Sequence, residues 1–390
     1  MEKKLIFYLK NLIHNGGSDL HLKSGSTIRL RINGELLKLG DKQISNEELD
    51  GIAQAILTAE QYENLVRTKE LDCTYVLDED HRFRVNFFYQ LDGLSAVMRI
   101  IPVKILTIEE LALPKAISQL ADAHRGLVLV TGVTGSGKST TLAAMLDRIN
   151  RNKKRHIITI EDPVEFVHKD QQSLVSQRSI GQDTLTFANA LKAALREDPD
   201  IILVGEMRDL ETIEIALHAA NTGHLVFSTL HTLDAKETIN RVIGMFPKEE
   251  QNRIRMTLAS VLEGVVSQRL VKAKGGGRVA AIEIMRRTAR ITELILENRD
   301  YEILDTMEEG KDIYGSQSFD QALLDLYHRG KITEETVLDN ATNPSDMKLK
   351  LQGIGKNLKG SNASHKDMED DVFDLKAVPD DEEDRETERY

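Results

Sequence analysis

Residues 125–140 read RGLVLVTGVTGSGKST, and this stretch decides the fold of the larger part of the chain. The continuous apolar run Leu127–Val130 predicts a strand of a parallel sheet, buried on both faces. The residues after it match G-x-x-x-x-G-K-[ST], a loop whose glycines let backbone N–H groups wrap phosphates. A strand before the loop and an Ala/Leu-rich helix after it are the context that this pattern requires. The sequence therefore predicts ATP binding.

The predicted loop assigns a role to its polar groups. Lys138 is expected to reach the β- and γ-phosphates, and the Ser139 hydroxyl is expected to bind Mg²⁺. ATP and Mg²⁺ are thus the predicted cofactors. The residues expected to contact nucleotide are Thr134, Gly135, Ser136, Gly137, Lys138, Ser139 and Thr140.

Further short apolar segments follow the loop, with helical segments between them. They cover residues 156–160, 201–204 and 225–229. Strands that alternate with helices predict an α/β fold with a doubly wound sheet. The segments after about residue 248 read as helical. The apolar stripe there, at helical spacing, consists of Ile254, Leu258, Val261, Leu262 and Val265.

The first hundred residues predict a separate α+β module. Asn33-Gly34 is a strong hairpin signal, and Ser45 with Glu48 makes a capping box that opens a helix. Alternating apolar and polar residues predict its strands. These strands are expected at 18–22, 27–32, 75–77, 83–89 and 96–101.

The composition limits the class of protein. Of the 390 residues, 41% are hydrophobic and 29% charged, as in ordinary globular proteins. No apolar run approaches the roughly 18 residues that span a bilayer, and the N-terminus does not resemble a secretory signal. Cys73 is the only cysteine, which excludes an intrachain disulfide and a cysteine-based zinc site. We therefore expect a cytoplasmic protein.

The negative charge is concentrated at the C-terminus. Residues 367–390 contain twelve acidic and three basic side chains, a net charge of −9 out of the −12 of the whole chain. Apolar density already falls after about Asn343, so we expect a disordered tail there. Its role is either to keep the protein soluble or to dock on a basic partner. The remaining body is nearly neutral, which argues against a dedicated nucleic-acid binder.

Phosphoryl transfer needs acidic groups beside the phosphate loop, and two predicted strands end in them. Glu161, Asp162 and Glu165 follow the strand at 156–160. Glu206 follows the strand at 201–204, in the place of a Walker B acid that binds Mg²⁺. Each cluster alone could be a solvated strand end, but both together after a phosphate loop favour a catalytic role.

Histidines and arginines are the remaining candidates. His224 and His231 flank the strand at 225–229 and could sense the γ-phosphate. Arginines on or beside predicted strands could supply a cation from another domain or subunit, although exposed strand arginines are more often simply solvated. These arginines are Arg82, Arg84, Arg99 and Arg125.

The order of the motifs is specific. After the phosphate loop come TIEDPVEF at 159–166, LREDPDIILVGEMRD at 195–209 and TGHLVFSTLHT at 222–232. This order resembles the secretion and pilus ATPases, with their Walker A, Asp, Walker B and His boxes, and most of all the PilT-type retraction ATPases of type IV pili. GSDLHL at 17–22 and RFRVN at 82–86 are similar to that family too.

The resemblance implies a PAS-like N-terminal domain over 1–101, a linker over 102–124 and a RecA-like ATPase domain with a helical C-terminal part over 125–343. An extension with the acidic tail over 344–390 follows. Among the acids, the resemblance favours Glu165 over Glu161 as the catalytic base. It gives Glu206 the Walker B role and makes His224 and His231 the His-box pair. It also makes Arg84 and Arg99 the arginines that approach nucleotide.

Two stretches depart from the retraction ATPases. Residues 289–297 read ARITELILE, so that Thr292 and Leu296 replace the two arginines of the family's AIRNLIRE motif. Residues 317–327 and 340–351 resemble PilU, an accessory paralogue. Extension and secretion ATPases fit less well, because they carry a four-cysteine zinc insertion.

The resemblance implies a homohexameric motor for pilus retraction and twitching motility, at the cytoplasmic face of the inner membrane. Its partners would be the inner-membrane platform protein, through peripheral membrane association, and a paralogous pilus ATPase. No nucleic acid is expected. Two alternatives stay open: a PilU-like accessory subunit whose own ATPase is partly dispensable, and a RecA-like nucleic-acid motor, which the near-neutral body disfavours.

Overall fold

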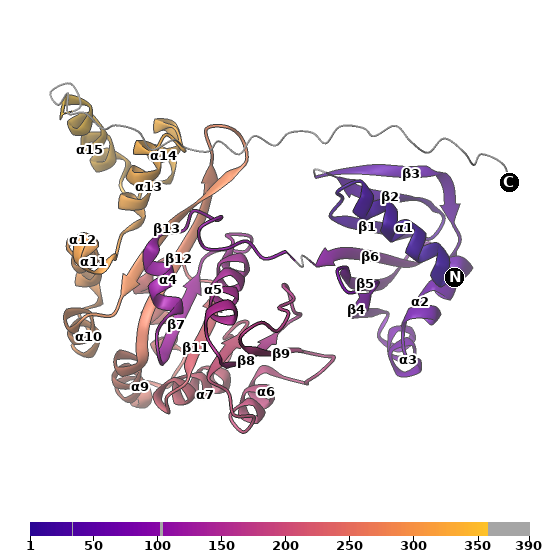
Figure 1. Ribbon diagram of the computed structural model, residues 1–390, viewed down its shortest axis with the longest axis horizontal. Coiled ribbons are helices and arrows are strands. Elements are labelled where there is room, and N and C mark those ends of the chain that lie inside the picture. Colours follow the sequence, from indigo (N-terminus) through magenta and orange to yellow (C-terminus); the bar gives the residue numbers. More distant parts are fainter. Residues whose placement is uncertain (33, 102–103, 358–390) are drawn as a thin grey trace. The chain divides into compact units, whose positions relative to one another are not determined.

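A computed structural model describes residues 1–32, 34–101 and 104–357. It contains two β-sheets that use separate parts of the chain (Figure 1). Within the described residues, no helix combines the length and the apolar character needed to cross a membrane.

The N-terminal sheet is antiparallel, in the order β3-β2-β1-β6-β5-β4. Its inner face packs on α1 (Glu2–His14), α2 (Asn46–Ile56) and α3 (Ala59–Thr68) through a core that includes Leu9 and Phe83. The capping box of Ser45 and Glu48 is confirmed at the start of α2. The strands are β1 (Asp19–Lys23), β2 (Ser26–Ile32), β3 (Glu35–Ile44), β4 (Glu70–Val76), β5 (Arg82–Gln90) and β6 (Gly93–Ile101).

One strand of this sheet was not predicted. Most residues of β3 are exposed on both faces of the strand. Its sequence therefore lacks the alternation of apolar and polar residues by which the other strands were predicted. β3 pairs with β2 in the register Ile32↔Glu35, as a hairpin requires. Asn33 of the predicted turn lies outside the described residues.

The second sheet has the order β13-β12-β7-β11-β10-β8-β9 and is parallel except for β13. The doubly wound α/β prediction is confirmed. The strands are β7 (Gly126–Thr131), β8 (His156–Glu161), β9 (Leu174–Ser179), β10 (Ile201–Val204), β11 (Leu225–Leu230), β12 (Leu262–Lys272) and β13 (Arg278–Arg286).

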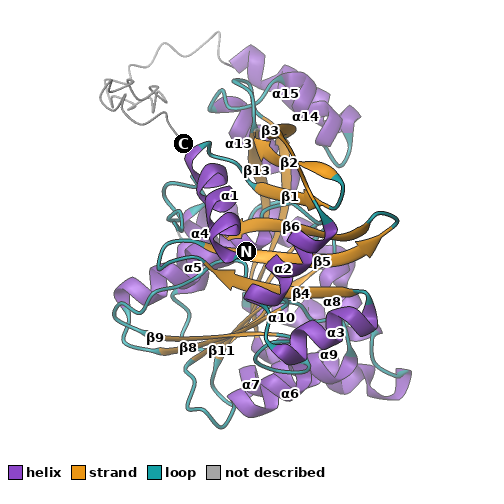
Figure 2. Ribbon diagram, turned by 90° about the vertical axis from the view of Figure 1, so that its right-hand side faces the viewer, coloured by secondary structure: helices purple, strands orange, loops and turns teal. Residues whose placement is uncertain are grey.

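Helices cover both faces of this sheet. α4 (Lys115–Ala121) and α5 (Lys138–Asn152) share a core with alternate residues of β7, such as Val128. The opposite core includes Leu127 and takes in α6 (Phe187–Ala194), α7 (Leu210–Asn221), α8 (Ala235–Gly244) and α9 (Lys248–Val261). Figure 2 shows α6 and α7 beside β8 and β11. Since Ile108 and α4 lie in this core, the segment predicted as a linker is not all connector.

The helical prediction after residue 248 is wrong for residues 262–286. α9 ends at Val261, and Leu262 begins β12, which lies between β7 and β13. Most of β12 is buried although it carries polar residues such as Ser267 and Gln268. Its apolar residues therefore do not alternate as in a half-buried strand, and Val265 continues the helical spacing of α9.

After β13 the named elements of the described chain are helices, as predicted. The helices are α10 (Ala289–Leu296), α11 (Ile303–Glu309), α12 (Lys311–Tyr314), α13 (Phe319–His328), α14 (Glu334–Asn340) and α15 (Pro344–Asn357). The disorder expected after Asn343 is therefore wrong up to Asn357, where Pro344 at the first helical position helps α15 to begin. The acidic run from Asp367 lies outside the described residues.

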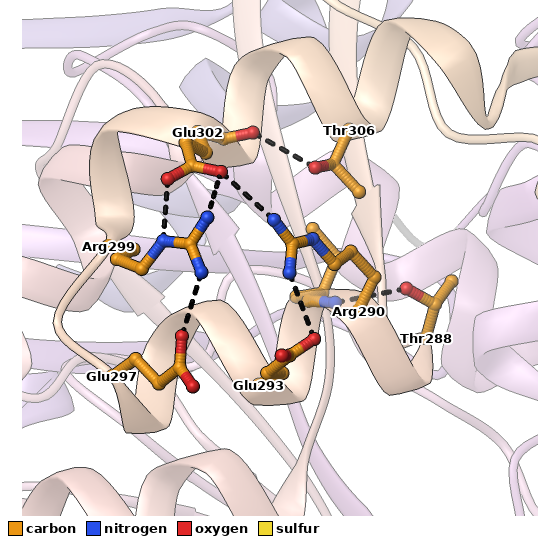
Figure 3. Close-up of polar contacts among 8 residues, drawn as sticks. Thr288, Arg290, Glu293, Glu297, Arg299, Glu302 and Thr306 are labelled. Atoms are coloured by element: carbon orange, nitrogen blue, oxygen red, sulfur yellow. Dashed lines mark hydrogen bonds and ion pairs between the residues drawn. The ribbon is translucent and has the colours of Figure 1, made fainter.

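The departing stretch 289–297 forms α10, and its apolar residues Ile291, Leu294 and Ile295 are buried. Its charged residues join an ion-pair cluster centred on Glu302 (Figure 3). Arg299 donates to both carboxylate oxygens of Glu302 at 2.6 Å, and Arg290 donates to one of them at 3.0 Å. The helix therefore keeps its packing although the two motif arginines are replaced.

Candidate functional site

The phosphate-binding loop lies between the end of β7 and the start of α5. Gly132 has φ 139°, and a Cβ there would lie 2.4 Å from the backbone oxygen of Gln268. Gly137, at the N-cap of α5, has φ 93°. Only glycine adopts such conformations at low cost. The loop thus points the N-terminus of a 15-residue helix at the space above the sheet, which is the arrangement that binds phosphate.

Lys138 is buried and folds back on the loop. Its Nζ donates to the carbonyl oxygens of Gly132 at 2.8 Å and Val133 at 3.1 Å. Burial lowers the pKa of Lys138, while the carboxylates of Glu206 and Glu165 act in the opposite direction. Both acids are therefore close enough to interact with the lysine that is expected to bind the phosphates.

Parallel strands bring the predicted motifs to one edge of the sheet. β7, β11, β10 and β8 are neighbours, and their carboxyl ends lead into the loop, His231, Glu206 and Glu161, respectively. A small cavity of about 50 Å³ at this edge is lined by Ser139, Glu161, Glu165, Gly205 and Thr229, among others. The crevice outside the carboxyl ends of strands is where open α/β sheets bind ligands.

The carboxylate of Glu206 has two partners, an arginine and a histidine. Arg208 Nη2 lies 2.7 Å from one carboxylate oxygen, and His231 Nε2 lies 3.2 Å from the other. Burial would raise the pKa of Glu206, but the hydrogen bond from Arg208 and the charge of His231 outweigh burial and lower it. Glu206 is thus an ionised carboxylate, as a Mg²⁺ ligand should be.

Arg208 was not predicted as a site residue, although it stands two positions after Glu206 in the motif. Its side chain is 70% exposed, and Asp162 adds to the charges that raise its pKa. The adjacency of an arginine to a Walker B acid was the available signal. Without the structure, nothing indicated that the two side chains point at each other.

The two glutamates after β8 differ in their surroundings. Glu161 accepts hydrogen bonds from Thr159 Oγ1 at 2.6 Å and from the backbone N–H of Glu165 at 3.2 Å, and burial raises its pKa. Glu161 is therefore occupied in shaping the loop that carries Glu165. Glu165 is exposed at the cavity, and among the described residues no side chain or N–H donates to its carboxylate, so it is the better placed of the two to bind a water molecule.

The structure separates the two histidines. His231 contacts Glu206, whereas His224 precedes β11 at the opposite edge of the sheet, where its backbone oxygen accepts from Gly126 N–H at 3.0 Å. A six-residue strand between them spans roughly 20 Å. His224 is thus remote from the loop of its own subunit, and phosphate sensing by both histidines in one subunit does not fit.

The four predicted arginines lie outside the elements that form the phosphate-binding loop and the acidic edge. Arg125 lies just before β7, at the edge opposite the loop. Arg82 and Arg84 are on β5, and Arg99 is on β6, in the N-terminal sheet. None of the four belongs to the elements that form the loop or the acidic edge, so a role for Arg84 or Arg99 in catalysis stays a prediction.

The residues at the acidic edge fit a magnesium ion. Ser139 and Glu206 offer the oxygen ligands that Mg²⁺ prefers. The buried Ser136 Oγ has no hydrogen-bond partner in the described structure, as expected of a group that binds a ligand. No group of three or more His, Cys, Asp or Glu side chains that could hold a metal occurs in the described part of the chain.

A buried histidine beside the same cavity predicts a pH effect on stability. Burial lowers the pKa of His168 to about 4. The unfolded chain binds this proton near pH 6.5, so stability is full above that pH and is lost as pH falls toward 4. We expect His168 to cost about 2 kcal/mol of unfolding free energy between pH 7.5 and pH 5.

Urea denaturation of the wild type and of His168→Leu at both pH values checks this prediction. The variant should lose less stability on acidification than the wild type, by about that amount. An identical loss in both proteins would show that His168 does not stay neutral in the folded state.

Comparisons with known proteins agree with this geometry. A family model described as type II/IV secretion system protein matches residues 1–312. The chain is 47% identical to the type IV pilus retraction ATPase PilT of Pseudomonas aeruginosa, over 85% of this chain and 96% of the relative. It is 37% identical to the type IV pilus ATPase PilU of the same organism, over 88% and 90% of the two chains.

A solved structure is also similar. The crystal structure of the pilus retraction motor PilT with bound ADP superposes with a TM-score of 0.83 at 41% identity, over 88% of this chain and 98% of that one. Sequence, fold and the nucleotide-binding edge therefore agree: the chain belongs to the type II/IV secretion system ATPase family.

Proposed function

We propose that this chain is an ATP-hydrolysing motor that powers retraction of type IV pili and hence twitching motility. The observation that carries the proposal is that Ser139 and Glu165 line one cavity beside the phosphate-binding loop, while Glu165 and Glu206 both act on the charge of Lys138. The relatives named as retraction ATPases are similar over nearly their whole length.

The proposed chemistry assigns one task to each group. Lys138 leaves the loop carbonyls and binds the β- and γ-phosphates together with the loop N–H groups. Glu165 orients a water molecule and takes its proton as the water oxygen bonds to the γ-phosphorus. The bond to the bridging oxygen breaks, and ADP and phosphate result. Mg²⁺ held by Ser139 and Glu206 would neutralise charge on the phosphate oxygens.

The neighbours of Glu206 give the site a way to respond to the γ-phosphate. His231 and Arg208 both contact the carboxylate of Glu206. Phosphate oxygens compete with Glu206 for these two side chains, so binding and release of the γ-phosphate would shift their positions. Arg84 and Arg99, from this or a neighbouring subunit, would complete the charge around the phosphate.

The proposed assembly is a homohexamer at the cytoplasmic face of the inner membrane. It would act on the pilus platform protein as a peripheral partner, with a paralogous pilus ATPase beside it and no nucleic acid. A strain that lacks this chain should lose twitching and carry excess surface pili, and the wild-type gene should restore retraction. Normal twitching in the deletion strain would contradict the proposal.

A second candidate is an accessory subunit that assists a separate motor. Two observations favour it: α10 lacks the two motif arginines, and the chain is also similar to PilU. The test is Glu206→Ala as the only copy of this chain, beside a fully active paralogue. Lost retraction supports the motor, whereas unchanged retraction supports the accessory role.

A further inference from the structure

Four charged residues form a row across the N-terminal sheet. Asp19 on β1 is directly opposite Arg31 on β2 and Arg99 on β6, and Arg99 is directly opposite Arg84 on β5. Residues opposite one another in a sheet share a face. The neighbouring positions Leu20, Leu30 and Met98 are buried in the domain core, so the row lies on the other face of the sheet.

The centre of this row is a buried carboxylate. The Asp19 side chain is only 4% exposed, whereas Arg99 is 69% exposed. One oxygen of Asp19 accepts from Arg99 Nε at 2.7 Å. The other accepts from Ser18 Oγ at 2.7 Å and lies 3.8 Å from Arg31 Nε. Burial would raise the pKa of Asp19, but the hydrogen bonds from Ser18 and Arg99 outweigh it, so this carboxyl is ionised.

The hydrogen bond engages a particular atom of Arg99. Asp19 holds Nε, and within the described structure the two Nη atoms of Arg99 have no hydrogen-bond acceptor. A planar guanidinium held at Nε still presents two parallel N–H donors, which is the geometry that binds phosphate. Arg84 is oriented in a similar way, with Nε 3.6 Å from Asp72, although that pair is exposed.

We infer that Asp19 is a positioning residue for ATP hydrolysis: it fixes Arg99 through Nε so that the two Nη atoms point outward to bind phosphate. This inference rests on the proposed function, in which Arg99 reaches nucleotide. Fixing the side chain in advance removes the entropy cost of ordering a long arginine when the transition state forms. The alternative is that the charges of Asp19 and its neighbouring arginines only stabilise the N-terminal domain and have no role in hydrolysis.

The test is a double-mutant cycle on the full-length oligomer, with kcat and KM for Mg-ATP as the readout. Asp19→Asn should lower kcat by about 10²-fold with KM unchanged, and Arg99→Gln by about 10³-fold. Because Asp19 acts only through Arg99, adding Asp19→Asn to Arg99→Gln should cause no further loss. Additive losses would overturn the inference.

Two further variants keep the test decisive. Asp92→Asn removes an exposed ion pair with Lys23 in the same domain and should turn over ATP like the wild type. Should Asp19→Asn fail to fold or assemble, Arg99→Lys replaces it, since a single ammonium cannot bind Asp19 and present two parallel donors. Arg99→Lys should then lower kcat as Asp19→Asn is expected to.

The outcomes separate this inference from the proposed function. If Arg99→Gln lowers kcat but both Asp19→Asn and Arg99→Lys have the wild-type kcat, Asp19 does not position Arg99. Arg99 then remains a catalytic residue that needs no positioning by Asp19. If Arg99→Gln itself has the wild-type kcat, Arg99 has no part in hydrolysis and the inference is overturned, whereas the proposed motor, which rests on Ser139, Glu165 and Glu206, still stands.

Discussion

Glu165→Gln is expected to lower the rate of ATP hydrolysis by about 10²- to 10⁴-fold, the usual contribution of a general base. Glutamine keeps the size of the side chain but cannot take the proton of the attacking water. Since Glu165 is exposed at the cavity, the substitution should leave folding intact. Nucleotide should still bind, because the loop and Lys138 are unchanged.

Rapid-quench measurement of a single turnover tests this prediction apart from product release. The matched control is Glu211→Gln, which removes an exposed carboxylate that pairs with Lys192 on the surface. The control should hydrolyse ATP at the wild-type rate, because exposed ion pairs contribute about 0–1 kcal/mol. A Glu165→Gln protein that cleaves ATP as fast as the control would show that another group activates the water.

Lys138→Ala is expected to abolish both tight ATP binding and hydrolysis. The ammonium is the one cation that the loop itself supplies, and loss of one such preorganised donor costs about 10²- to 10³-fold in rate alone. The substitution also removes the hydrogen bonds to Gly132 and Val133. Since it relieves the burial of a charge as well, we expect little change in the melting temperature.

Isothermal titration with a slowly hydrolysed ATP analogue and steady-state phosphate release measure the two effects. Lys192→Ala, which removes an exposed lysine on α6, is the control and should bind like the wild type. Tight binding by Lys138→Ala would mean that the loop N–H groups hold the phosphates without the lysine.

The fold was predictable where a local pattern has one interpretation. The run Leu127–Val130, followed by glycines at fixed spacing and a helix, leaves little choice, and β7 and α5 form there. β12 was not predicted, because polar residues such as Ser267 and Gln268 interrupt its apolar residues, and Val265 continues the helical apolar spacing of α9. The strand β3 was not predicted because neither of its faces is consistently buried, so its sequence shows no apolar face.

The residues of the candidate site could be predicted from the sequence, but the contacts between their side chains could not. The carboxyl ends of parallel strands meet at one edge, which places Glu206 and His231 near the loop from topology alone. The sequence offers no measure of which side chains pair, so the contact of Arg208 with Glu206 was missed. His224 stands in the same motif as His231, but the length of β11 carries it to the opposite edge.

In the proposed function, ATP turnover at this site drives pilus retraction. The most direct measurement is the retraction speed of single labelled pili in cells that lack the paralogue and carry the wild type, Arg99→Lys or Glu165→Gln as the only copy. We expect the retraction speed to fall in proportion to the kcat of each purified protein and to reach zero with Glu165→Gln. Unchanged speed in a variant with slowed turnover would contradict it.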